Sequence, residues 1–395
     1  MKIIDLKART VAIPTKGMLR HSTGVHPGYL MRTILELVTD QGIVGLGEVG
    51  GGDQRAALLR LKPRLVGMDP FHLEAIKLRT LRNAYYLCNA RLYGAIEIAC
   101  LDIQGKAADV PVHALLGGKV RNRIPMIAYL FWRYDRPGGG HDTRAEDMAD
   151  LCEQLHETLG VRAMKMKAGV LDPMEEARAV MLCRERLGEE FGLRIDPNGS
   201  WPVNTAVRIG RALEDHGLQY YEDPAWGLEG MRAVRRQVRI PLATNMAPNR
   251  FEDLGPAVRM DSIDVILTDL HYWEGPRGVK DLAAVCRTFQ LDVAMHSGTE
   301  FGIELAAMLH TAASIPAMTL EGDAHYHYLE DDIIAGGKMP YVDGAIAVPD
   351  GPGLGVDLDE EKMARYQAFF EEHGDYYARF QADPYHGGRA ANPGK

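Results

Sequence analysis

The hydrophobic pattern of the first part of the chain changes from strand-like to helical. Over residues 1–50, apolar and polar positions alternate as in half-buried strands, and the Asp40–Gly42 step between two apolar runs is typical of a hairpin. Over residues 53–117 the apolar spacing becomes helical, as in YGAIEIACLDIQGKAA, and stops near LLGG. These patterns predict a small α+β domain over residues 1–122.

Short apolar runs alternate with amphipathic helices from about residue 123 onward. Strand–helix alternation implies a parallel sheet, and eight such units suggest that the sheet closes into a ring. We therefore predict a (β/α) TIM barrel over residues 123–340 and expect residues 341–395 to return to the N-terminal domain. The eight predicted strands are IPMIAYLF, RAMKMK, GLRID, LQYYED, IPLATN, DVILTD, LDVAMH and AMTLEG.

A polar residue ends each of five successive predicted strands. The five are Asp196, Glu222, Asn245, Asp269 and His296, at spacings of 26, 23, 24 and 27 residues, which is about one βα unit of a barrel. Taken singly, each has an ordinary structural explanation, such as a turn, a helix cap or a structural histidine. Independent turns and caps have no reason to recur in step with the strands. The register therefore indicates a shared site at the carboxyl ends of the strands, where barrel enzymes keep their active sites.

The first three of these residues suit a hard cation. Asp196 and Glu222 offer carboxylates and Asn245 offers an amide carbonyl. Mg²⁺ prefers oxygen ligands and keeps positions open for water or substrate, and the sequence has no Cys and His cluster with zinc-like spacing. We predict a Mg²⁺ site on these three residues, whose neutral third ligand would leave the ion more positive toward an anionic substrate.

Candidate acids and bases lie on opposite sides of the predicted ring. Lys165 and Lys167 are two apart in RAMKMK, so both side chains point the same way. Outward-facing lysines are the structural alternative, but the apolar neighbours favour a buried strand, where two close ammonium groups would lower each other's pKa. His296 ends the seventh predicted strand and Asp269 the strand beside it, where a carboxylate can fix the histidine tautomer. A lysine on one face and a His–Asp pair on the other form a two-base arrangement.

Composition and charge narrow the class of protein. A chain of 395 residues with 46% hydrophobic and 25% charged residues is typical of a soluble globular protein of two domains. The net charge of −9, with basic residues interspersed among acidic ones, argues against a nucleic-acid partner. The five cysteines form no C-x-x-C pair, and no segment has the pattern of a signal peptide or a membrane span. We expect a cytoplasmic protein with reduced thiols and no membrane partner.

Several motifs at these positions are those of one known family. They are K-M-K at 165–167, D-P-N-G-S-W at 196–201, E-D-P at 222–224, A-T-N-M at 243–246, T-D-L-H-Y-W at 268–273 and H-S-G-T-E-F-G-I at 296–303. The Y-L-F motif at 129–131 and the G-V-H-P-G loop at 24–28 are further matches. Over nearly its whole length the chain resembles the enolase superfamily, of the mandelate racemase and muconate lactonizing enzyme type, and within it the glucarate dehydratase group.

The resemblance implies a modified barrel under an α+β capping domain that the C-terminal segment completes. It implies Mg²⁺ on the three residues named above. It makes Lys167 the base on one face and His296, oriented by Asp269, the acid or base on the other, with Lys165 as a further catalytic residue. We also expect a homo-oligomer. The implied substrate contacts are His26, Tyr129, Lys165, Asn198, Asn245, Ser297 and His325.

The sequence departs from the pattern of that group around the far end of the substrate. Gly298 stands where the group has Asn, Gly94 where it has Thr, and His21 where the cap loop more often has Asn. We find no match for the group's C-terminal arginine contact. The resemblance therefore implies intact catalytic machinery with an altered distal pocket.

These residues predict the dehydration of an acid sugar. The proton beside the carboxylate is removed to give an enediolate, and loss of the β-hydroxyl then gives a 2-keto-3-deoxy acid sugar. Racemisation or epimerisation by the same residues is the first alternative, and an inactive paralogue that acts as a partner protein is the second. A metallohydrolase would have H-x-H on the first barrel strand, which IAYLF lacks.

Overall fold

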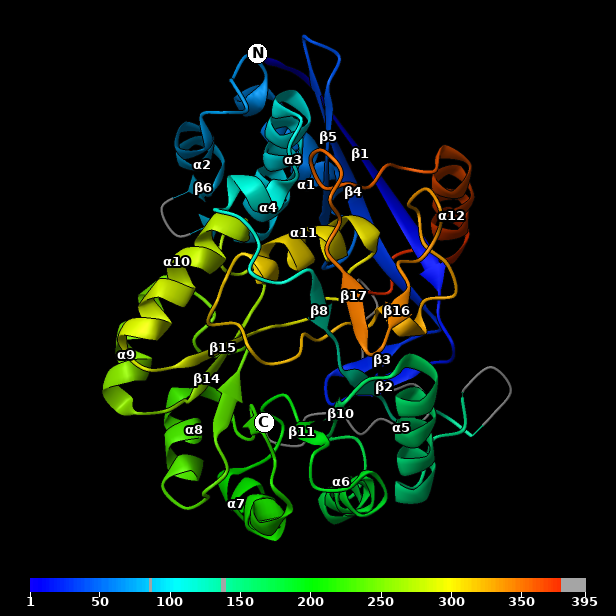
Figure 1. Cartoon of the computed structure of the whole chain (residues 1–395), viewed down its shortest axis with the longest axis vertical. Coiled ribbons are helices and arrows are strands. Elements are labelled where there is room, and N and C mark those ends of the chain that lie inside the picture. The colour runs from blue at the N-terminus through cyan, green and yellow to red at the C-terminus, as the bar shows by residue number, and fades with distance from the viewer. Residues whose placement is uncertain (85–86, 136–139, 378–395) are drawn as a thin grey trace.

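An antiparallel sheet with helices packed on it forms the N-terminal part of the molecule (Figure 1). The computed structural model describes residues 1–84, 87–135 and 140–377. The sheet has the order β1-β4-β5, with β1 at Ile3–Pro14, β4 at Tyr29–Thr39 and β5 at Val44–Val49. Two short hairpins accompany it, β2–β3 (Leu19–His21 and Gly24–His26) and β6–β7 (Arg82–Ala84 and Leu87–Cys88). The helices are α1 (Arg55–Leu65), α2 (Leu73–Thr80), α3 (Ala90–Ala108) and α4 (Val112–Leu115).

Two glycines allow α3 to approach β5 closely. A Cβ atom at Gly45 would lie 2.1 Å from the carbonyl oxygen of Ala99, and one at Gly47 would lie 2.3 Å from that of Ala95. Both distances are far below van der Waals contact, so a side chain at either position would push the helix off the sheet. The G-L-G run therefore sets the spacing between these two layers.

Seven parallel strands form the second part, with helices outside them (Figure 1). Their order follows the chain from β9 to β15, and nearly every strand residue is buried, which is why the strands read as continuous apolar runs. The strands are β9 (Ala128–Leu130), β10 (Ala163–Lys167), β11 (Gly192–Asp196), β12 (Tyr220–Glu222), β13 (Leu242–Thr244), β14 (Val265–Thr268) and β15 (Asp292–Met295). The helices are α5 (Ala145–Leu159), α6 (Pro173–Leu187), α7 (Val203–Leu213), α8 (Gly227–Arg235), α9 (Phe251–Met260), α10 (Gly275–Thr288) and α11 (Gly302–Ala313). The predicted modified barrel with an N-terminal α+β domain is confirmed.

The eighth predicted strand, AMTLEG, is wrong. Residues 317–319 turn instead, with Met318 N donating to Ile315 O and Thr319 N to Ala317 O, so these amides are not available to a ladder. The segment bridges the two sheet edges through a few isolated bonds: Gly322 N donates to Pro125 O at 2.8 Å, Ile127 N donates to Gly322 O at 3.1 Å, and Asp323 N donates to Met295 O at 2.9 Å. We refer to this junction between β15 and β9 as the seam.

The C-terminal segment touches both parts of the molecule. Strand β17 (Ala345–Ala347) pairs with β16 (Tyr341–Val342) on one side and on the other with β8 (Arg123–Pro125), which leads into the barrel. The chain then passes α3, where Leu354 N donates to Asp102 Oδ1 at 2.8 Å. Helix α12 (Glu360–His373) packs beside β1. Two short 3₁₀ turns, Glu214–His216 and Tyr326–Tyr328, complete the described elements.

No helix in the described ranges is long and apolar enough to cross a membrane. Four cysteines are buried and free, namely Cys100, Cys152, Cys183 and Cys286, while the side chain of Cys88 lies outside the described part.

Candidate active site

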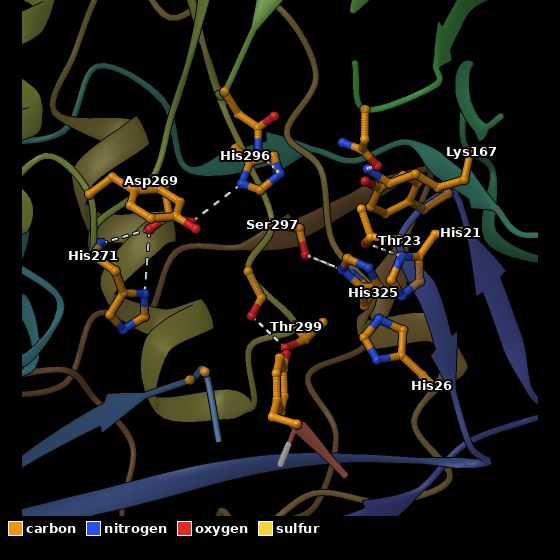
Figure 2. A pocket seen from close by; sticks show the side chains of 18 of the residues that line it. His21, Thr23, His26, Lys167, Asp269, His271, His296, Ser297, Thr299 and His325 are labelled. Carbon is orange, nitrogen blue, oxygen red and sulfur yellow. Dashed lines mark hydrogen bonds and ion pairs between the residues drawn. The ribbon is translucent and has the colours of Figure 1, made fainter. Parts of the chain in front are cut away.

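A cavity of about 440 Å³ lies between the carboxyl ends of the barrel strands and the N-terminal part. Figure 2 shows Lys167 on one side of it and Asp269 with His296 on the other. The N-terminal part contributes His21, His26 and Arg32 to the wall. The predicted site residues that line the cavity are His26, Tyr129, Lys167, Asn198, Asn245, Asp269, His296, Ser297 and His325.

The predicted metal ligands lie together at the ends of three adjacent strands. Asp196 ends β11, Glu222 ends β12, and Asn245 follows β13. Carboxylate oxygens of Asp196, Glu222 and the neighbouring Asp223 lie within 4.8 Å of one another and are buried. Glu222 Oε1 and Asn245 Oδ1 are buried and have no hydrogen-bond partner in the described part of the chain. Buried oxygens without donors are costly unless a cation meets them, so this donor set fits a hard divalent ion.

Asp223 holds the loop that carries the third predicted ligand. Its Oδ1 accepts from Thr244 Oγ1 at 2.6 Å, and its Oδ2 accepts from Asn245 N at 3.1 Å. Both oxygens are thus used to hold the loop after β13. Asn245 directs its amide Nδ2 to His296 Nε2 at 2.9 Å, which leaves Oδ1 for the cation. Because an amide nitrogen only donates, Nε2 of His296 is the unprotonated ring nitrogen.

Both lysines are paired with these carboxylates. Lys165 contacts Glu222 at 2.7 Å and also pairs with Asp323, while Lys167 pairs with Asp196 and donates to Asn198 at 2.9 Å. Burial alone would lower the pKa of Lys167, but Asp196, Tyr129 and Glu222 together outweigh it, and the pKa is raised. Burial would also lower the pKa of Lys165, but the charges of Asp323 and Glu222 contribute to raising it well above its ordinary value. The expected lowering by the neighbouring ammonium acts on Lys167 but is smaller than the pull of the carboxylates.

His296 and Asp269 face each other from neighbouring strands. His296 Nδ1 lies 3.3 Å from Asp269 Oδ2, and both side chains are more than nine-tenths buried. Burial would raise the pKa of Asp269, but hydrogen bonds from His271 and His296 hold it well below its ordinary value. The carboxylate therefore stays charged and keeps the proton of His296 on Nδ1, which matches the unprotonated Nε2 on the cavity side.

The other predicted contacts form a wall of neutral groups. The pKa of His26 is lowered to about 3 by burial and by Lys167, and burial also holds the pKa of His21 and His325 well below the ordinary value. His325 Nδ1 lies 2.6 Å from Ser297 Oγ, and its ring packs on Tyr129 with centroids 4.6 Å apart. Because their pKa values are lowered, these rings can offer hydrogen bonds but no charge at neutral pH. Lys165, Asp196 and Glu222 lie behind the wall and do not line the cavity.

Two departures from the group's pattern occur where a side chain would be crowded. A Cβ atom at Gly94 would lie 2.6 Å from the carbonyl oxygen of Leu270, and one at Gly298 would lie 3.1 Å from Asp269 Oδ2. At Gly94 the backbone of this chain leaves no room for a side chain, whereas at Gly298 the side chain of Asp269 would have to shift slightly.

The sequence analysis missed several buried charged residues around the site. Asp223 stands inside the quoted E-D-P motif, and Asp323 lies two residues before the predicted contact His325, but neither was assigned a role. Others are Arg32, Glu48, His271 and Glu304, which lie in apolar runs or beside predicted strand ends. A charged residue inside an apolar run is the signal that identifies such residues, because buried charges need partners.

Comparison with known proteins agrees with this fold and site. The enolase C-terminal domain-like family matches residues 147–362, and the mandelate racemase/muconate lactonizing enzyme N-terminal domain matches residues 21–117. A probable glucarate dehydratase of Streptomyces coelicolor is 38% identical over 381 residues, covering 88% of this chain and 86% of the relative. A chloromuconate cycloisomerase of Cupriavidus pinatubonensis is 28% identical, covering 92% of this chain and 96% of the relative. A crystal structure of an enolase from Thermobispora bispora with magnesium and formate superposes with a TM-score of 0.89 at 39% identity, covering 95% of this chain and 94% of the other.

The fold and the cavity define a barrel enzyme whose strand ends can hold a divalent cation between a lysine and a histidine. The chain belongs to the enolase superfamily, in its mandelate racemase and muconate lactonizing enzyme branch. The family resemblance inferred from the motifs is confirmed.

Proposed function

We propose that this protein is a Mg²⁺-dependent acid-sugar dehydratase. The observation that carries the proposal is the pair of opposed groups in one cavity: Lys167 on one side and His296, backed by Asp269, on the other. The probable glucarate dehydratase among the relatives supports this reaction, and the magnesium in the Thermobispora structure supports this cofactor.

Asp196, Glu222 and Asn245 are the proposed Mg²⁺ ligands. Two of them present a buried oxygen without a partner in the described ranges, and all are hard oxygen donors. When bound, Mg²⁺ supplies positive charge that offsets the charge an acid sugar gains when the proton beside its carboxylate leaves. The same charge would compete with Lys165 and Lys167 for the carboxylates that they now contact.

The residues of this chain divide the proton transfers between two faces. His296 presents an unprotonated Nε2 on one face and Lys167 lies on the other, so the group facing the α-proton can take it while the opposite group gives a proton. The C–H bond breaks, its electron pair is delocalised into the carboxylate, and the pair then expels the β-hydroxyl. That hydroxyl takes a proton from the acid and leaves as water, and the enol that remains becomes a 2-keto-3-deoxy acid.

An isomerase activity is the second candidate. If no leaving group lies near the acid, the group on the second face returns a proton to the same carbon, which is racemisation or epimerisation. The two opposed groups are as well placed for this reaction as for dehydration. The cycloisomerase among the relatives is named for an isomerisation. The inactive-paralogue alternative expects lost ligands or bases, whereas every residue of the proposed set is present here.

A panel of mono- and diacid sugars with Mg²⁺ tests the proposal. Ketone formation, trapped with semicarbazide, together with one solvent deuterium in product formed in D₂O, is the expected result. Deuterium uptake without ketone would instead assign the isomerase activity. The double variant Lys167→Ala/His296→Asn is the matched control and is expected to give neither signal. Absence of both signals from the wild type with every acid sugar would contradict the proposed function.

A further inference from the structure

A buried cluster of charged residues joins the N-terminal part to the His296–Asp269 pair. Its members are Arg32 in β4, Glu48 in β5, Glu304 in α11, and Asp269 and His271 after β14, none of them more than 5% exposed. Arg32 contacts Glu48 at 2.7 Å and also pairs with Glu304. We refer to these five residues as the bridging cluster; Figure 2 shows His271 beside Asp269 within it.

Both ring nitrogens of His271 face oxygens that accept hydrogen bonds. Nδ1 lies 2.8 Å from Glu304 Oε1 and 3.4 Å from Asp269 Oδ1, and Nε2 lies 3.0 Å from the backbone carbonyl oxygen of Glu48. A backbone carbonyl cannot donate, so Nε2 carries a proton. A neutral ring would then direct the lone pair of Nδ1 at two carboxylates. Only a ring with a proton on each nitrogen satisfies all three contacts with both carboxylates charged.

The charge count of the bridging cluster agrees with this assignment. Within the cluster three carboxylates face one guanidinium, so a neutral His271 would leave the cluster a net charge of −2 and a charged one a net charge of −1. Arg91, outside the cluster, also interacts electrostatically with Asp269. Uncompensated buried charge is costly. Placing the proton on Glu304 instead would weaken its pairing with Arg32.

We infer that His271 is a fixed imidazolium and a positioning residue that ties Asp269 to the N-terminal part of the molecule. The side chains of Asp269, His271 and Glu304 are of the types that bind metal ions, and their ligand atoms lie close together. His271 Nδ1 lies at a direct hydrogen-bond distance of 2.8 Å from one oxygen of Glu304, and Arg32 supplies a cation to the other oxygen, so we assign the ring itself as the second cation of this cluster.

The same cluster holds the loop that follows His296. Arg32 Nη1 donates to Gly298 O at 2.7 Å, and Glu48 accepts from Phe301 N at 2.7 Å and from Glu304 N at 3.0 Å. His271 also donates its backbone N–H to Asp269 at 2.7 Å. Through these bonds, β4 and β5 fix both the carboxylate and the loop that carry the histidine side of the site.

The proton count on His271 can be measured without any substrate. In protein labelled with ¹⁵N-histidine, at neutral pH and without Mg²⁺, we expect both nitrogens of His271 to show one-bond couplings to protons, a pair of signals that His271→Asn removes. His310 is the internal control. It accepts from His113 N on Nδ1 at 3.2 Å and contacts Leu354 O through Nε2 at 3.1 Å, so the same reasoning gives it one proton. Burial lowers the pKa of His310 to about 4, which agrees.

One unprotonated nitrogen on His271 would overturn the inference. If His271→Asn does not fold, neutron diffraction from wild-type crystals at neutral pH reports the same two protons directly, and a missing proton there has the same meaning.

The consequence for chemistry rests on the proposed function and has its own test. Because His271 orients Asp269 and touches nothing on the Lys167 side, His271→Asn should slow α-deuterium exchange at the His296 face by about tenfold or more, out of the roughly 10²- to 10⁴-fold that a positioned base contributes. Exchange at the Lys167 face should change far less. An equal loss on both faces would reject the positioning role, whereas no exchange in the wild type would reject the proposed function and leave the proton count standing.

Discussion

The amide of Asn245 serves two partners at once, and this explains why an amide stands there. Its nitrogen donates to His296 Nε2 while its oxygen stays free beside the two carboxylates. A carboxylate at this position would still offer oxygen to a cation, but it could only accept from the histidine. It would therefore draw the ring proton to Nε2, the nitrogen that has to be free to act as a base.

Asn245→Asp should separate metal binding from base catalysis. We expect Mg²⁺ affinity, measured by calorimetry, to be equal to or higher than in the wild type, because a negative ligand is added. Exchange at the His296 face should fall by about 10²-fold, within the range for a lost general base. A variant with weakened Mg²⁺ binding and unchanged exchange would contradict the two-partner interpretation.

Lys167→Ala and His296→Asn should each remove the proton transfer on one face only. The expected loss is about 10²- to 10⁴-fold for substrates whose α-proton faces the missing group. Circular dichroism should show a retained fold. Wild-type turnover by either variant, measured with substrates of both configurations, would rule out its assigned role.

Glu300 should make stability depend on pH. Burial raises its pKa from an ordinary 4.5 to about 7, although Ser297 donates to it at 2.6 Å. The folded protein thus holds this proton more tightly than the unfolded chain does. The resulting stabilisation is complete below about pH 4.5 and is lost as the pH rises through about 7.

Glu300→Gln removes this titration. Between pH 5 and pH 8 the wild type should lose more unfolding free energy than the variant, by roughly 3 kcal/mol at most, since one pKa unit is worth about 1.4 kcal/mol. Urea unfolding at several pH values measures the difference. Parallel curves for the two proteins would show that Glu300 keeps an ordinary pKa.

Sequence reasoning at this scale found residues that end strands and missed residues that act through packing. Asp196, Glu222 and Asn245 could be found because strand spacing shows without coordinates. Asp223 and His271 could not be assigned a role, because their partners, Thr244 and Glu304, come from other segments. The pKa direction of Lys167 was wrong for the same reason: its neighbour in sequence is a lysine, but its neighbour in space is Asp196.

At the scale of elements, apolar runs located seven of the eight predicted barrel strands. The runs are short and buried, so their hydrophobicity identified them although periodicity did not. AMTLEG has the same composition but begins directly after Pro316, and its first residues turn. Composition alone does not distinguish such a turn from a strand, because the two differ in which backbone hydrogen bonds the residues make.

Helix α12 offers an element-scale prediction. Asp359 caps it by accepting from Glu361 N and Lys362 N, both at 3.1 Å. Asp359→Ala should lower the unfolding free energy by about 1 kcal/mol, whereas Asp359→Ser, which keeps a capping oxygen, should recover most of it. Urea midpoints test this, and an equal loss in both variants would mean that the cap bond is not the cause.

At the scale of the whole molecule, the proposed Mg²⁺ site should couple to global stability. An ion that binds only the folded chain raises the unfolding free energy by about 2.7 kcal/mol at a hundredfold excess over its Kd. The melting temperature of the wild type should therefore rise with Mg²⁺. Asp196→Ala should lose this response, while Asp215→Ala, a change at a side chain 91% exposed, should keep it. A response retained by Asp196→Ala would count against the ligand set.

The seam has a consequence for how variants of Lys165 are interpreted. Where the other strands share ladders, β15 and β9 are connected only by isolated main-chain bonds of Gly322 and Asp323 within the described part of the chain, and the carboxylate of Asp323 pairs with Lys165. At the seam, the ion pair between Asp323 and Lys165 helps to close the barrel, whereas between the other strands backbone hydrogen bonds do so. Removing Lys165 would leave the buried carboxylate of Asp323 without its cation at the seam. Loss of activity in a Lys165 variant could therefore come from a disturbed barrel rather than from a lost catalytic group.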